Sequence, residues 1–347
     1  MDNLLDNIVR EKRSEELAKL NAIHIVNGLF SDLMERERDI LTRRFGLNGE
    51  KNETLEKIGQ LHKLTRERVR QIENASIKKI KRLDSLGDYL STLKGVVADL
   101  LKEHGGLLRR DFLLDILTVI SLEMGNTADI NSEEYIKSRQ IYKNRFDFLL
   151  SKLLVDDFDL LPDSSKFNAS IKTKDVSLEH IEALSKDMLT KVESLNKTLD
   201  TDELIGLLKK LDSYNHYQNN LSAQDGTDIT SIFKSQVFPD KAEIINSNKT
   251  LYSVLQAVKD LEQNKFGHWG KADWQEIKPK TINDKIYLVL KNSGQALHFT
   301  DIASKINDVR FDRKNANPAT VHNELILDDR YVLTGRGMYG LREWQNN

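Results

Sequence analysis

Between Thr65 and Leu83 the chain carries side chains that suit contact with nucleic acid. Arginine can hold guanine O6 and N7 through two hydrogen bonds, glutamine can hold adenine, and glutamate can accept from cytosine N4. Lysine and arginine also neutralise phosphates. The run holds Arg66, Glu67, Arg68, Arg70, Gln71, Lys78, Lys79, Lys81 and Arg82. These residue types fit a surface that reads base edges and contacts the backbone of duplex DNA.

These residues lie on the second of two short amphipathic helices. Thr54 is placed to cap the first helix and Thr65 the second, with a break between them at Lys63-Leu64. The apolar positions recur at helical spacing: Leu55, Ile58 and Leu61 in the first helix, and Val69, Ile72, Ser76, Ile80 and Leu83 in the second. A second helix that is apolar on one face and basic on the other, after a tight turn, predicts a helix-turn-helix. A charged helix face that meets only solvent is the plainer alternative.

The stretch from Arg36 onward resembles region four of housekeeping-type sigma factors, which reads the upstream promoter element. The motifs RERDIL, RRFGL, TLEKIG and TRERVRQIE follow one another in the family's order and spacing, and the resemblance covers about Ala22–Leu83. It implies two partners, duplex DNA and the RNA polymerase core, where the family docks on the flap of the β subunit. It also implies four base-facing positions: Arg66, Glu67, Arg70 and Gln71.

The other candidates are assigned to phosphate or to a partner protein. This set is Lys78, Lys79, Lys81 and Arg82. The hydroxyls or backbone amides of Thr54 and Thr65 are expected to touch phosphate as well as to cap helices. With Arg68, these residues complete the predicted DNA-binding site.

One position departs from the family at the turn. Where the family often has Gly, Asp or Asn, this chain has Lys63. A left-handed lysine there would cost on the order of 1 kcal/mol, so we expect a slightly strained turn.

Composition narrows the class of protein. The chain has 347 residues, of which 39% are hydrophobic, and its net charge is −2. Residues 36–82 hold 14 Lys/Arg against 7 Asp/Glu, a local charge of +7, which indicates one basic module on an acidic body. The chain has no cysteine, and its eight histidines show no ligand spacing, so we expect no disulfide, metal or other cofactor. No catalytic motif appears, and we expect a non-enzymatic, cytoplasmic, nucleoid-associated protein without a membrane partner.

The last stretch predicts a second recognisable domain. Thr281–Lys291, a helix around Ile302–Ile306, and Pro318–Leu327 precede two short strands, Tyr331–Thr334 and Met338–Leu341. The residues LHFTDIASKI, NPATVHNELILDDRYVL and GRGMYGLREW resemble the HARE-HTH winged-helix family over about Thr281–Trp344. That family includes a domain of the delta subunit of Gram-positive RNA polymerase. The resemblance implies a winged helix and leaves its ligand open.

The middle of the chain predicts two further domains. We expect a joint at Gly87 and Gly95, a loop over Gly125–Gln140 and a polar loop over Asp212–Ser231. The order helix, turn, helix, loop, helix, hairpin predicts a winged helix, with an irregular helical spacer as the alternative for the second half. The expected domains are 1–87 (helix-turn-helix), 88–176 (degenerate winged helix), 177–274 (winged-helix-like or spacer) and 275–347 (HARE-HTH).

The predicted fold is therefore mainly α and multi-domain, with helix-turn-helix and winged-helix domains and small β-hairpin wings. We expect a DNA-binding transcription regulator or polymerase-associated factor that recognises promoter-type duplex DNA through the 66–82 helix. No stretch resembles sigma region two, which melts promoter DNA, so we expect an accessory factor. The alternative is a protein-interaction scaffold of RNA polymerase with incidental DNA contact. A specificity subunit of a DNA-processing enzyme rests on HARE-HTH analogy alone.

Overall fold

The computed structural model describes residues 20–123, 132–221 and 240–345. It is mainly α-helical with small antiparallel sheets and several domains, which confirms the predicted fold class. The chain divides into two compact units, residues 1–181 with 217–257, and residues 182–216 with 258–347. Among the described residues, no helix combines the length and the apolar character that a membrane crossing needs.

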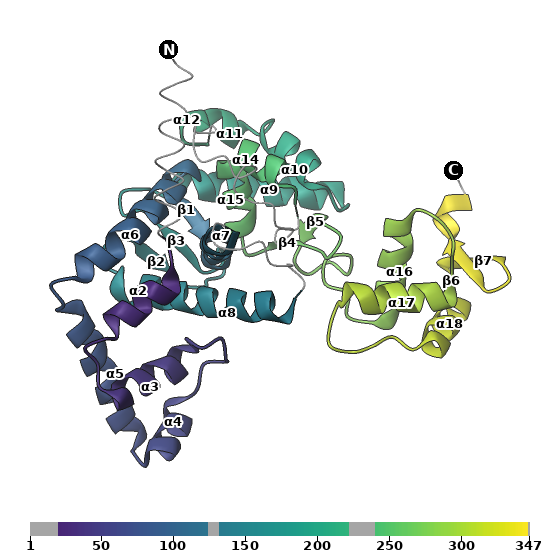
Figure 1. Cartoon of the computed structure of the whole chain (residues 1–347). Coiled ribbons are helices and arrows are strands. Elements are labelled where there is room, and N and C mark those ends of the chain that lie inside the picture. The colour runs from purple at the N-terminus through teal and green to yellow at the C-terminus, as the bar shows by residue number, and fades with distance from the viewer. Residues whose placement is uncertain (1–19, 124–131, 222–239, 346–347) are drawn as a thin grey trace. The chain divides into compact units, whose positions relative to one another are not determined.

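From residue 20, where the described part of the first unit starts, four helices follow one another. They are α2 (Ala22–Leu29), α3 (Glu35–Phe45), α4 (Leu55–His62) and α5 (Arg66–Lys81), drawn from purple to blue in Figure 1. The apolar face of α2, with Ile25, Val26 and Leu29, is buried, and Gly46 ends α3 in the left-handed conformation. The core shared by α3, α4 and α5 is small, with Ile40, Ile58 and Val69 fully buried and Leu55, Leu64 and Ile72 packed against them.

One predicted core position in these helices is wrong. Leu61 is 55% exposed, whereas Ile58, one turn earlier on the same face, is fully buried. Because α4 ends at His62, Leu61 lies at the end of the helix, past the small core.

A module of helices and a three-stranded sheet follows. Its elements are α6 (Leu86–Glu103), β1 (Leu107–Arg109), α7 (Arg110–Glu123), α8 (Glu133–Phe148), the π-helix η1 (Leu149–Leu153), β2 (Asp159–Leu161) and β3 (Ser170–Lys172). The strands pair antiparallel in the order β1-β3-β2, so the first strand joins the last.

Two expectations for this module are wrong. Helix α6 runs through Gly87 and Gly95 without a joint, because its buried stripe of Leu90, Leu93 and Val97 outweighs a cost of about 1 kcal/mol for each glycine. The expected loop over Gly125–Gln140 is helical from Glu133, where Ser132 caps α8. Its earlier residues lie mostly outside the described part of the chain.

The next stretch contributes elements to both units. They are α9 (Glu179–Leu195), α10 (Thr201–Leu208), α11 (Asp212–His216), α12 (Gln218–Leu221), α14 (Ala242–Ser247), α15 (Lys249–Ala257), β4 (Leu261–Gln263) and β5 (Trp269–Lys271). The expected polar loop over Asp212–Ser231 is wrong where α11 and α12 form. Residues 222–231 lie outside the described part of the chain. In the first unit, α15 packs against β1, and a buried ion pair joins Lys249 to Glu103 at 2.9 Å.

The last module repeats the order of the first one. It contains α16 (Ile282–Ser293), β6 (Leu297–His298), α17 (Phe299–Val309), α18 (Pro318–Leu327), β7 (Tyr331–Gly335), β8 (Met338–Leu341) and a 3-10 helix, η2 (Arg342–Gln345). The sheet order is β6-β8-β7, again with the first strand beside the last. The helices and strands expected here are confirmed, and Gly337 (φ +71) turns the hairpin where a Cβ would meet His298.

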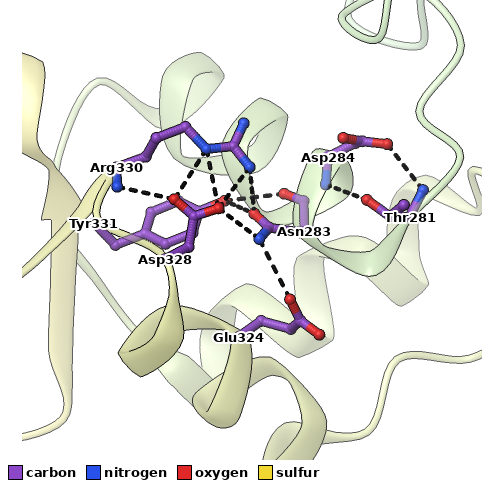
Figure 2. A network of polar contacts seen from close by, with 7 residues as sticks. All are labelled: Thr281, Asn283, Asp284, Glu324, Asp328, Arg330 and Tyr331. Atoms are coloured by element: carbon purple, nitrogen blue, oxygen red, sulfur yellow. Dashed lines mark hydrogen bonds and ion pairs between the residues drawn. The ribbon is translucent and has the colours of Figure 1, made fainter.

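A polar network centred on Asn283 ties α16 to the residues that follow α18 (Figure 2). The side-chain amide of Asn283 donates to the Asp328 carboxylate at 2.7 Å. The Tyr331 hydroxyl donates to the backbone carbonyl of Asn283 at 2.9 Å. Arg330 donates to both Asn283 and Asp328, and its hydrogen bond lowers the pKa of Asp328 to about 2. These contacts fix the entry into the hairpin.

In the first unit, His104 at the end of α6 generates a pH prediction. It is buried, its Nδ1–H donates to the Leu100 carbonyl at 2.7 Å, and burial lowers its pKa from 6.5 to about 4. The unfolded chain therefore binds this proton more readily. The contribution of neutral His104 to the free energy of unfolding is fully present above pH 6.5. It is lost as the pH drops toward 4, which costs on the order of 3 kcal/mol.

Urea unfolding across this pH range measures the effect, with His104→Gln as the control that cannot titrate. We expect the wild-type curve to lose more stability on acidification than the variant curve. Parallel curves would contradict the assignment of this pH dependence to His104.

Candidate nucleic-acid interface

Threonine caps set the start of both helices of the helix-turn-helix. The Thr54 hydroxyl accepts from the Lys57 amide at 3.2 Å, and the Thr65 hydroxyl accepts from the Arg68 amide at 3.2 Å. Both capping predictions are confirmed. Each hydroxyl satisfies one amide at the positive end of a helix dipole. The other amides of the first turn have no partner within the helix and can therefore bind an anion.

The turn between the helices holds Lys63 in the left-handed conformation, with φ 57° and ψ 42°. Its amide donates to the Gln60 carbonyl, and the Leu64 amide donates to the Gly59 carbonyl at 2.8 Å. A Cβ on Gly59 would lie 2.7 Å from the Leu64 carbonyl oxygen, so the turn passes very close to α4. The expected strained lysine is therefore present.

All predicted DNA-binding side chains are exposed. They are Thr54, Thr65, Arg66, Glu67, Arg68, Arg70, Gln71, Lys78, Lys79, Lys81 and Arg82. The four base-facing candidates lie on the first two turns of α5, where the chain emerges from the tight turn.

These side chains already hydrogen-bond to one another. Arg70 donates to both carboxylate oxygens of Glu67 at 2.8 and 2.7 Å, and Arg68 donates to Gln71 at 3.1 Å. The bond with Arg70 lowers the pKa of Glu67 and raises that of Arg70, so both stay charged at neutral pH. Arg66 pairs with Glu56 of α4 at 3.1 Å. Contact with bases would replace these exposed and individually weak bonds.

The basic residues at the other end of α5 separate into two groups. Lys79 donates to the Asp32 carbonyl and lies 3.7 Å from the Glu37 carboxylate, so it holds α5 against the preceding helices. Lys78, Lys81 and Arg82 are exposed, and Lys81 lies 3.6 Å from Asp156.

Sequence reasoning missed the ion pair that orients α5. Glu73 is buried on the inner face of the helix and accepts from Arg44 Nε at 3.3 Å. The same guanidinium donates to the Glu53 carbonyl at 3.1 Å. Arg44 thus joins α3, α5 and the start of α4. The position of Glu73 on the apolar face of the second helix could have predicted this ion pair from the sequence.

Sequence reasoning also missed a support from the following module. Arg145 on α8 donates to the Leu47 carbonyl at 3.0 Å, the Ile23 carbonyl at 3.1 Å and Asn27 Oδ1 at 3.0 Å. The buried Phe148 ring lies 5.0 Å from Phe45. We call α8 and η1 the clasp, since they cover one face of α2 and α3.

Comparisons with known proteins agree with this geometry. Residues 29–82 match the family model described as Sigma-70, region 4. The chain is 44% identical over 71 residues to "RNA polymerase sigma factor SigA1" of Synechococcus elongatus, covering 20% of this chain and 18% of the relative. It is 41% identical over 88 residues to the chloroplastic "RNA polymerase sigma factor sigD" of Arabidopsis thaliana, covering 24% and 21%. The chain spans about a fifth of the length of these curated relatives, and no solved structure matches it.

The left-handed turn generates a stability prediction. Lys63→Gly should raise the free energy of unfolding by up to about 1 kcal/mol, because glycine relieves the positive φ but gains freedom in the unfolded chain. The denaturant midpoint measures it. Lys63→Ala is the control, since alanine keeps the steric cost and should give little gain. A clear loss of stability in the glycine variant would contradict a left-handed turn.

The clasp generates a second prediction. Arg145→Ala leaves two backbone carbonyls and Asn27 without this donor, and should cost about 1–3 kcal/mol. Hydrogen exchange of the full chain should then accelerate in α2, α3 and the loop at residues 46–50. Arg139→Ala is the matched control on the same helix, because Arg139 pairs with Asp115 of α7 at 2.9 Å. Equal effects of the two variants on α2 and α3 would contradict the role of the clasp.

Proposed function

We propose that this chain is a DNA-binding transcription protein that acts with RNA polymerase and reads duplex DNA through α5. One observation carries the proposal. In a segment similar to sigma region four, a capped helix leaves a tight turn with Arg66, Arg70 and Gln71 exposed on its first two turns. Bidentate arginine and glutamine side chains at this end of a recognition helix suit the major groove.

The proposal gives each group of residues a role. Arg66, Glu67, Arg70 and Gln71 face base edges. Lys78, Lys81 and Arg82 face phosphates, and Thr54, Thr65 and Arg68 contact the backbone near the helix starts. Lys79 is assigned to positioning, because its ammonium already contacts Asp32 and Glu37.

RNA polymerase is the proposed protein partner. The similar proteins are named RNA polymerase sigma factors, which supports the polymerase core as a partner. Within the core, the flap of the β subunit is proposed from the family resemblance. The protein is proposed to be non-enzymatic, cytoplasmic and associated with the nucleoid.

The remaining modules are proposed to be winged helices. Residues 88–176 and 275–347 share one element order and one sheet topology, and in 177–274 Leu199 pairs with Trp269 as a first strand would. We propose that 275–347 is a HARE-HTH domain. Its α18 has no lysine or arginine and exposes Ile326 and Leu327, which favours contact with protein. We propose that the first of these boundaries, expected at residue 87, lies in the turn before Leu86, because α6 begins there.

The two ends of α5 should respond differently to substitution. In the full chain, Arg70→Ala and Gln71→Ala should each cost about 1–3 kcal/mol on a preferred duplex and relax its sequence preference. Lys81→Ala should weaken all sequences alike and reduce the dependence of log K on log salt by about one unit.

Selection from random duplexes, followed by titration at several salt concentrations, measures both effects. Indistinguishable sequence profiles for Arg70→Ala and Lys81→Ala would contradict the division into base and phosphate contacts. Absence of duplex binding by the wild-type chain, with capture of RNA polymerase intact, would favour the scaffold alternative.

A further inference from the structure

The turn after η1, residues 154–158, carries two adjacent aspartates in a fixed position. Leu154 and Phe158, at its two ends, are buried. The amides of Asp157 and Phe158 donate to the Leu154 carbonyl, and the Lys174 ammonium donates to the Asp156 carbonyl at 2.6 Å. The clasp anchors the start of this turn against α2 and α3. The aspartates therefore stand on a rigid support.

Each aspartate faces a lysine from a different helix. The Asp156 carboxylate lies 3.6 Å from the ammonium of Lys81 at the end of α5. The Asp157 carboxylate pairs with Lys94 of α6. One turn of the following module thus meets two cations on consecutive helices.

The Lys81–Asp156 pair is easily exchanged, whereas the Asp157 side chain is only 25% exposed. Asp156 is 86% exposed, and a pair between exposed side chains contributes little stability because water and salt screen it. A DNA phosphate that replaces the carboxylate also releases counterions from the duplex, which favours binding at low salt. A carboxylate beside the Lys81 ammonium lowers the positive potential that a phosphate would meet there.

We propose that Lys81 and Lys94 form a phosphate-binding strip across α5 and α6, and that Asp156 and Asp157 are internal competitors that limit its affinity for duplex DNA. This inference rests on the proposed DNA-binding function. It adds Lys94 to the interface and makes the acidic turn a determinant of how tightly the chain holds DNA.

The test uses the full chain and a fluorescently labelled duplex of mixed sequence, titrated from low to physiological salt. Asp156→Asn should raise affinity about threefold to tenfold at low salt and steepen the salt dependence by up to about 0.9. Asp157→Asn should act in the same direction. Asp159→Asn is the matched control, because it removes the same charge three residues away but pairs with Lys172, at 3.0 Å.

A double-mutant cycle tests the specific pairing. Lys81→Ala should abolish the gain from Asp156→Asn, whereas Lys94→Ala should abolish the gain from Asp157→Asn. Equal gains from Asp156→Asn and Asp159→Asn, or no gain from Asp156→Asn, would overturn the inference while wild-type binding is intact. Failure of the wild-type chain to bind any duplex would overturn the proposed function instead.

Discussion

The smallness of the core behind α5 is the constraint on which this interface depends. A helix that offers one charged face to DNA has only a narrow apolar strip with which to hold its place. Here that strip meets a core of Ile40, Ile58 and Val69, much smaller than the core of the C-terminal module. A cluster this small gives α5 little apolar support, and we infer that other contacts help to orient the recognition helix. The Arg44–Glu73 pair and η1 of the clasp, which packs against α5, supply those contacts.

Modules with the same order of elements use their helices for different contacts. The third helix of the first module, α8, is occupied by contacts with α2 and α3, and α15 is almost entirely buried against β1. In the last module, α18 keeps Ile326 and Leu327 exposed. In the modules that we propose to be winged helices, the helix that would usually meet a ligand can therefore be used for internal support. This shows why fold alone does not assign function to these modules.

Local chemistry was predictable from the sequence, and long-range pairing was not. Thr54 and Thr65 act through neighbours within a few residues, so spacing was enough to place them. The joint expected at Gly87 and Gly95 was wrong, because the low helix propensity of glycine costs less free energy than the buried apolar stripe of α6 contributes. Arg145 donates to the carbonyl of Ile23, 122 residues away, and the periodicity of a sequence does not predict such a contact. The candidate site was therefore predictable as a surface, but its supports were not.

Photo-crosslinking of the full chain to a selected duplex, followed by peptide mapping, tests the central claim most directly. The interface described here predicts crosslinks concentrated in residues 54–82, with the strongest at the first two turns of α5. Crosslinks confined to residues 281–344, or a chain that binds duplex without crosslinks to α5, would contradict it.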